Sequence, residues 1–137
     1  MSPEKPILLV EDDRIDAMAV KRAVKELKIA NPLITVSNGE EALAYLYDVQ
    51  NTMPTIILLD INMPKMNGIE FLEIVKQDEK LKRLPVIVLT TSKEDQDRYN
   101  SFDIGASGYM IKPVDYSQFV EVIRTIYDYW SHSEQSD

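Results

Sequence analysis

Acidic, hydroxyl and amino side chains follow four of the five short apolar segments in the sequence. Glu11 and Asp12 follow the first segment, Asp60 the third, Thr90 the fourth and Lys112 the fifth. Grouped carboxylates bind hard divalent cations, and hydroxyl and ammonium groups can hold the oxygens of a phosphoryl group. A carboxylate can also act as a nucleophile and form an acyl phosphate. These residue types therefore predict metal-dependent phosphoryl chemistry with Asp60 as the acceptor.

The five apolar segments themselves predict the strands of a parallel sheet. They are short, most are rich in Ile and Val, and none alternates with polar residues, which is typical of strands buried on both faces. The segments are Ile7–Val10, Leu33–Val36, Ile56–Leu59, Val86–Leu89 and Tyr109–Ile111. Between them, apolar residues recur at helical spacing. We therefore expect an α/β fold, (βα)5, with a doubly wound five-stranded parallel sheet and helices on both faces.

Capping residues and apolar spacing predict where the helices lie. Ser37–Glu41 is a helix-start signal with acids in the first turn, and a third helix follows Asn67–Gly68. A fourth helix is expected over residues 94–104, with Gly105 as its C-cap, and the last begins near Asp115. The apolar faces of the other helices are predicted to contain Val20, Ala23, Val24 and Leu27; Ala42, Leu43 and Leu46; Ile69, Leu72 and Val75; and Phe119, Ile123, Ile126 and Trp130.

The strand order decides whether the chemical residues meet. Ligands of open parallel sheets bind beyond the carboxyl ends of the strands, near the switch in strand order. In the order 2-1-3-4-5, the first, third, fourth and fifth strands are neighbours, and these are the strands that the chemical residues follow. Each residue also has a purely structural interpretation, such as a helix cap for Asp13 or β-propensity for Thr90. All of these would have to hold together on four adjacent strand ends, so we prefer the functional interpretation.

The carboxylates favour a hard metal ion. Glu11, Asp12 and Asp60 would crowd negative charge and raise a carboxyl pKa unless a cation neutralises it. All candidate ligands are oxygens, and the only histidine, His132, lies in the polar C-terminal segment. Oxygen ligands select Mg2+, with Mn2+ as the alternative, over zinc. We therefore expect Mg2+ as the cofactor.

Composition limits the function further. The 137 residues suit a single domain over 1–137, with a core at about 6–130, loose ends and no output domain. With 15 basic and 23 acidic residues, the net charge is −8, so neither nucleic acid nor an anionic membrane is an expected partner. The chain has no cysteine, and no apolar stretch approaches the length that spans a bilayer. We expect a cytoplasmic protein that binds other proteins or cations.

Four stretches carry a resemblance to a known family. They are Ile7–Asp13, Leu58–Gly68, Pro85–Ser92 and Gly105–Pro113, and the match covers nearly the whole chain. The sequence resembles the receiver domains of two-component response regulators, in particular the stand-alone CheY-like type. This resemblance implies the flavodoxin-like fold with strand order 2-1-3-4-5 and a protein that takes a phosphoryl group from a histidine kinase. It is not expected to be an enzyme beyond catalysing its own phosphotransfer and dephosphorylation.

The resemblance also implies a role for each metal-site residue. Asp60 matches the phosphorylated residue, which is also a metal ligand. Asp12 matches the acid that binds Mg2+ directly, and Glu11 the acid that acts largely through water. Asn62 lies at the position that offers a backbone carbonyl to the metal.

Further residues match the phosphate contacts and the family's switch. Thr90 and Lys112 correspond to the hydroxyl and the lysine that contact the phosphoryl group, and the Lys112–Pro113 peptide is expected to be cis. In the family's switch, Thr90 moves toward the phosphoryl group and Tyr109 turns inward. The face of helix 4, strand 5 and helix 5 is thereby reshaped for partner binding or dimerisation.

The resemblance implies protein partners: a sensor histidine kinase or a histidine phosphotransfer protein, and a downstream target. Output by docking and a phosphorelay to a histidine phosphotransfer protein both stay open. The stretches Asp60–Gly68 and Val86–Ser92 look most like regulators paired with phytochrome-type kinases. The last helix carries Tyr127, Tyr129 and Trp130, more aromatic surface than one buried face accommodates. These residues mark a candidate partner or homodimer surface, with packing under the chain end as the alternative.

Other phosphate-handling classes fit less well. A haloacid-dehalogenase-type phosphatase also uses an Asp nucleophile but needs a second acid two residues later, where this chain has Asn62. A flavodoxin-like FMN protein needs a Ser/Thr/Gly-rich loop after the first strand, where this chain has three acids. A P-loop NTPase needs a glycine-rich loop ending in Gly-Lys-Ser/Thr, and none of the four glycines is so placed.

Overall fold

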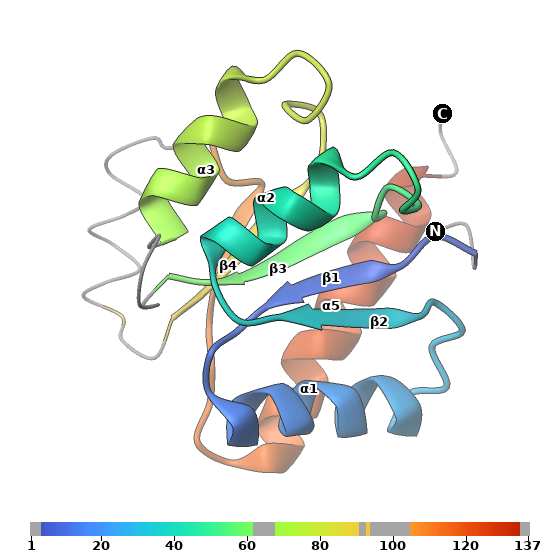
Figure 1. Cartoon of the computed structure of the whole chain (residues 1–137). Coiled ribbons are helices and arrows are strands. Elements are labelled where there is room, and N and C mark those ends of the chain that lie inside the picture. Colours follow the sequence, from blue (N-terminus) through green and yellow to red (C-terminus); the bar gives the residue numbers. More distant parts are fainter. Residues whose placement is uncertain (1–3, 62–67, 91–92, 94–104, 135–137) are drawn as a thin grey trace.

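The computed structural model describes residues 4–61, 68–90, 93 and 105–134, and its described elements alternate between strand and helix up to β4, which is followed by β5 and then α5 (Figure 1). The predicted helix over residues 94–104 lies outside the described residues, so its prediction is not addressed. The elements in chain order are β1 (Ile7–Val10), α1 (Arg14–Glu26), β2 (Leu33–Val36), α2 (Gly39–Tyr47), β3 (Ile56–Asp60), α3 (Gly68–Gln77), β4 (Val86–Thr90), β5 (Gly108–Ile111) and α5 (Tyr116–Glu134).

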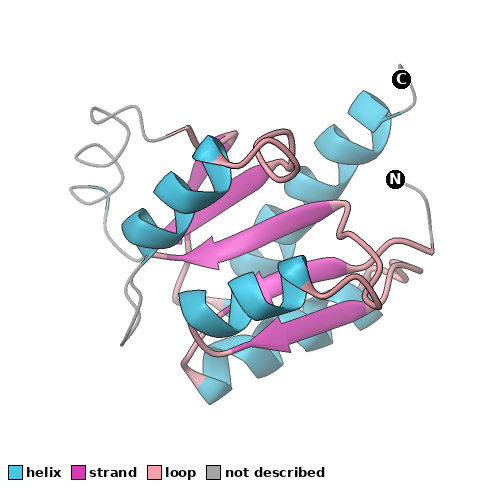
Figure 2. Ribbon diagram, turned by 45° about the horizontal axis from the view of Figure 1, so that its top comes forward, coloured by secondary structure: helices cyan, strands magenta, loops and turns pink. Residues whose placement is uncertain are grey.

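The strands form one parallel sheet in the order β2-β1-β3-β4-β5, as predicted. Residues of β1, β3 and β4 are buried throughout, which is why these segments are continuously apolar rather than alternating. Figure 2 shows the strand arrows pointing the same way, so the carboxyl ends of the strands share one edge. Asp60 and Thr90 are the last residues of β3 and β4.

Helices cover both faces of the sheet, with α2 and α3 on one side and α1 and α5 on the other (Figure 1). Because successive strand residues point to opposite faces, β1 contributes Leu9 to the core under α1 and α5, and Leu8 to the core under α2 and α3. Each face therefore has its own apolar layer. Within the described residues, no helix combines the length and apolarity needed to cross a membrane.

The helices begin where their capping residues predict. Asp13 precedes α1, and its carboxylate accepts hydrogen bonds from the backbone N–H groups of Ile15 at 2.8 Å and Asp16 at 3.0 Å. Asn38 precedes α2 and accepts from the N–H of Glu41 at 2.9 Å. These caps fix the first turns of the helices that follow β1 and β2.

The aromatic residues of α5 only partly match the predicted surface. Tyr127 and Trp130 are half-buried and pack against the core that α5 shares with α1. Tyr129 is 62% exposed and lies against Trp130, with ring centroids 4.5 Å apart. The exposed aromatic surface is therefore narrower than predicted, because two of the three rings already cover the end of the core.

Candidate functional site

Three carboxylates meet at the carboxyl edge of the sheet. Oxygens of Glu11, Asp12 and Asp60 lie within 4.8 Å of one another. Glu11 and Asp60 are buried, at 3% and 7% exposure, whereas Asp12 is exposed. The carboxylates lie close together because β1 and β3 are neighbours in the sheet. Val10 at the end of β1 pairs with Leu59, the residue before Asp60. The predicted acidic cluster is therefore present.

The cluster carries more negative charge than its burial tolerates. Burial raises the pKa of Glu11 to about 8, and a hydrogen bond and charge repulsion from Asp60 add to the effect, against a smaller opposing influence of Lys112. Crowded, buried carboxylates are suited to a divalent cation, which would neutralise their charge. The protein ligands are all hard oxygens, which fits Mg2+ or Mn2+.

Lys112 reaches this cluster from the end of β5. Its Nζ donates hydrogen bonds to Glu11 Oε1 at 3.0 Å and to Asp16 Oδ2 at 2.9 Å, and its side chain is only 8% exposed. Burial by itself would lower the pKa of Lys112. The carboxylates of Asp16, Asp60 and Glu11 outweigh burial and raise the pKa to about 12, so the ammonium stays charged.

Thr90 and Tyr109 lie on the adjoining strands. Thr90 is 1% exposed and ends β4, where Leu89 pairs with Asp60 of β3. Its carbonyl accepts the backbone N–H of Lys112 at 2.7 Å, which ties the end of β5 to the end of β4. Tyr109 is half-buried and packs against the core under α2 and α3. Thr90 and Lys112, the two residues predicted to contact the phosphoryl group, thus lie next to the acidic cluster.

One predicted backbone feature is wrong, and one predicted ligand is not described. No peptide bond between described residues is cis, so the Lys112–Pro113 bond is trans. Trans is the favoured isomer even before proline, by about 0.5–1 kcal/mol, and Lys112 is aimed at the cluster by its own hydrogen bonds. Asn62 lies outside the described residues.

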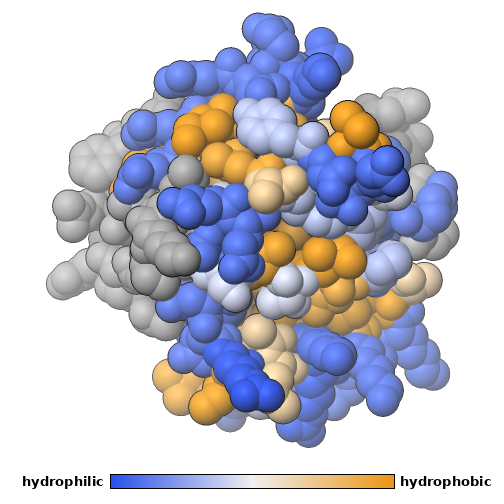
Figure 3. All heavy atoms as spheres, in the orientation of Figure 1, coloured by the Kyte–Doolittle hydropathy of each residue, from blue (hydrophilic) through white to orange (hydrophobic). Residues whose placement is uncertain are grey.

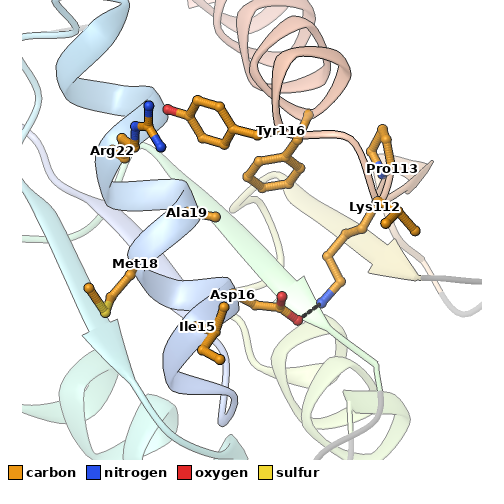
Figure 4. Close-up of a pocket in the computed structure, with 10 residues that line it drawn as sticks. Ile15, Asp16, Met18, Ala19, Arg22, Lys112, Pro113 and Tyr116 are labelled. Carbon is orange, nitrogen blue, oxygen red and sulfur yellow. Dashed lines mark hydrogen bonds and ion pairs between the residues drawn. The ribbon is translucent and has the colours of Figure 1, made fainter.

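Asp16 is a site residue that the sequence analysis missed. It lies in the first turn of α1 and forms the 2.9 Å ion pair with Lys112 (Figure 4). The available signal was an acid in the first turn of the helix capped by Asp13, a position that the helix dipole alone explains. That signal did not reveal the partner, which lies 96 residues further along the chain.

A parallel sheet in this order, with an acidic cluster and a buried lysine at its carboxyl edge, defines a class of signalling domain. The family model described as the response regulator receiver domain matches residues 7–124. The chain belongs to this family.

Similar proteins include stand-alone regulators of nearly the same length. The response regulator Rcp1 of Synechocystis sp. is 36% identical over 133 residues, which cover 94% of this chain and 90% of that protein. The crystal structure of the phosphorylated cyanobacterial phytochrome response regulator RcpA superposes with a TM-score of 0.84 at 36% identity, covering 95% of this chain and 96% of that one. The Mn2+-bound form of Rcp1 gives a TM-score of 0.81 at 35% identity, covering 92% and 94%.

Proposed function

We propose that this receiver domain accepts a phosphoryl group on Asp60 from the phosphohistidine of a sensor kinase, in a reaction that requires Mg2+. The observation that carries the proposal is the meeting of Glu11, Asp12 and Asp60 beside the ammonium of Lys112. The names of the relatives add support, because one neighbouring structure is of a phosphorylated regulator and another of a Mn2+-bound one.

The proposed transfer is an in-line displacement at phosphorus. A carboxylate oxygen of Asp60 forms a bond to phosphorus while the bond from phosphorus to the histidine nitrogen breaks, and the electron pair of that bond stays with the imidazole. The product is an aspartyl phosphate. No other substrate is proposed: the domain catalyses this transfer and the later hydrolysis of its own acyl phosphate.

The surrounding residues are proposed to hold the charges that move. Glu11, Asp12, Asp60 and the backbone carbonyl of Asn62 would hold Mg2+, which supplies neutralisation of the phosphoryl oxygens when it is bound. Lys112 contributes a permanent positive charge to the same oxygens, because its pKa of about 12 keeps it protonated. The hydroxyl of Thr90 is proposed to donate to another phosphoryl oxygen.

The kinase is proposed to be of the phytochrome type, and the regulator to act in the cytoplasm. The relative with a structure named as a phytochrome response regulator supports the choice of kinase. Phosphotransfer from a panel of purified kinases tests it: efficient transfer only from kinases of other types contradicts the assignment. The proposed output is the switch at Thr90 and Tyr109, which presents the face of β5 and α5 to a downstream target or a second copy of the chain.

The first test is intact-mass spectrometry after incubation with acetyl phosphate. We expect one added phosphoryl group that requires Mg2+ and is absent in Asp60→Asn, and Asp128→Asn, an exposed aspartate of α5, serves as the matched control that stays phosphorylated. An adduct that persists in Asp60→Asn, or forms equally without a divalent cation, contradicts the proposal. If no adduct appears, beryllofluoride binding separates a short-lived phosphate from a protein that accepts none.

A further inference from the structure

Two neighbouring pockets on the surface share part of their lining, and Asp16 belongs to the shared part. The first hollow is the acidic one, lined by Asp12, Asp13, Arg14, Ile15, Asp16, Asp60 and Lys112. The second is a mainly apolar groove of about 460 Å³ between α1 and the start of α5, shown in Figure 4. Ile15, Asp16 and Lys112 line both. The ion pair of Asp16 and Lys112 therefore separates the phosphoacceptor pocket from the groove.

Asp16 is well placed to hold a lysine and also to release it. The cap at Asp13 fixes its backbone in the first turn of α1, through the 3.0 Å bond to the Asp16 N–H. Its side chain is 44% exposed, whereas the side chain of Glu11, the other partner of Lys112, is 1% exposed. Water can therefore replace Lys112 at Asp16 but cannot readily do so at Glu11.

Asp16 and a phosphoryl group on Asp60 would compete for the single positive charge of Lys112. An ammonium group has three N–H donors, and two of those of Lys112 serve Glu11 and Asp16, which leaves at most one for a phosphoryl oxygen while the bond to Asp16 lasts. A contact in a buried position is hard to give up because water cannot replace the lost partner, whereas a half-exposed carboxylate can be hydrated instead. A phosphoryl group on Asp60 should therefore draw Lys112 away from Asp16, while the contact with Glu11 persists.

We propose that Asp16 is a positioning residue that holds the Lys112 ammonium in the resting protein and competes with the phosphoryl group for it. This inference depends on the proposed function, because it concerns the phosphorylated state of Asp60. In the resting state, Asp16 keeps Lys112 at the wall between the two hollows. On phosphorylation, Lys112 turns to the phosphoryl oxygens and Asp16 becomes hydrated, so the side of the groove next to α1 changes its charge.

The main test measures the affinity for beryllofluoride in the presence of Mg2+. Asp16→Asn keeps the shape of the side chain and removes the competing charge, so we expect beryllofluoride to bind about two- to fivefold more tightly than to the wild type. Asp16→Glu retains a carboxylate and should stay near the wild-type affinity. Glu26→Gln is the matched control, because it makes the same change of charge at an exposed position of the same helix.

A double-mutant cycle distinguishes competition from a general effect on structure. In a Lys112→Ala background, Asp16→Asn should no longer alter the affinity, because the group for which it competes is gone. A second readout uses protein without metal or beryllofluoride. The buried Lys112 ammonium should give a slowly exchanging NMR signal in the wild type and in Glu26→Gln, and a broadened signal in Asp16→Asn.

The outcomes separate this inference from the proposed function. A wild type that takes neither phosphate nor beryllofluoride removes the proposed function and this inference with it. If the wild type binds beryllofluoride but Asp16→Asn behaves like Glu26→Gln, or binds it more weakly, the competing role of Asp16 is overturned and the proposed function stands. The same holds if the Asp16→Asn effect persists unchanged without Lys112.

Discussion

Strands β3 and β5 each place one residue of the proposed site, Asp60 and Lys112, yet the two strands are held very differently. β3 lies between β1 and β4, and all five of its residues are buried. β5 lies at the edge of the sheet, and all four of its residues are half-buried. A central strand is held from both sides and both faces, whereas an edge strand can shift with a smaller loss of buried area. The proposed acceptor Asp60 thus comes from the strand held more firmly, and Lys112 follows the strand held less firmly.

The two groups also differ in how far they reach. Asp60 is part of β3 itself and extends only a short side chain from it. Lys112 extends four methylene groups from beyond β5 to the carboxylates of Glu11 and Asp16. In the proposed function, a short acid on a central strand defines where the phosphoryl group is attached. A long cation on an edge strand would follow that group and carry the change toward the surface near β5 and α5.

Truncating one core residue in each strand gives the largest expected contrast. Leu59→Ala in β3 removes a fully buried side chain and should lower the free energy of unfolding by about 2–5 kcal/mol. Met110→Ala in β5 removes a half-buried one and should cost about 1 kcal/mol. Urea denaturation with matching m-values measures both. Equal losses would show that β5 is held as firmly as β3.

Substituting alanine for two glycines tests the same contrast between β3 and β5, by adding a methyl group instead of removing a side chain. A Cβ at Gly68, directly after the β3 connection, would lie 2.8 Å from the backbone Cα of Ile61, so Gly68→Ala should destabilise by about 1–3 kcal/mol. A Cβ at Gly108 in β5 would meet only side-chain ends, at 3.2 Å from Ile87 Cδ1 and 3.7 Å from Trp130 Cη2. These can move, so Gly108→Ala should cost under about 1 kcal/mol. Thermal melting compares the two, and the reverse order contradicts this account.

A further expected effect concerns association through the β5 and α5 face, not the stability of the fold. Tyr129 is 62% exposed and lines a hollow with Ser107 and Met110, so Tyr129→Ser should weaken self-association of the phosphorylated or beryllofluoride-bound protein about tenfold. A substitution of Tyr127 would not test association alone, because Tyr127 packs against the core and its loss would also lower stability. Sedimentation velocity measures the change, with the exposed Tyr47→Ser of α2 as control. Association that is unaffected by Tyr129→Ser removes this face as the interface.

The surface explains why so few positions are candidates for such contacts. Polar and charged residues cover most of the face shown in Figure 3, and exposed hydrophobic side chains are few among the described residues. Ile15 and Met18 of α1 are 78% and 63% exposed and line the groove beside Asp16. Because Asp16 and Lys112 line both this groove and the acidic hollow, the proposed movement of Lys112 would alter this apolar surface as well as β5.

Much of this protein could be predicted from the sequence because the signals are local. Continuous apolar runs mark strands buried on both faces, and Asp13 and Asn38 mark the first turns of the two helices that they cap. The residue that ends or follows a strand must lie at the carboxyl edge of a parallel sheet. Therefore Glu11, Asp12 and Asp60 could be placed together before any coordinates were known.

Only the tertiary structure decided the features that depend on distances between remote parts of the chain. The partner of Asp16 is Lys112, and no periodicity links positions so far apart. The partial burial of Tyr127 and Trp130 likewise depends on how α5 packs against the core. The sequence by itself determined which groups gather at the sheet edge, since strand order and strand ends suffice for that. Which of them pair was decided by side-chain reach and burial, which exist only once the chain has folded.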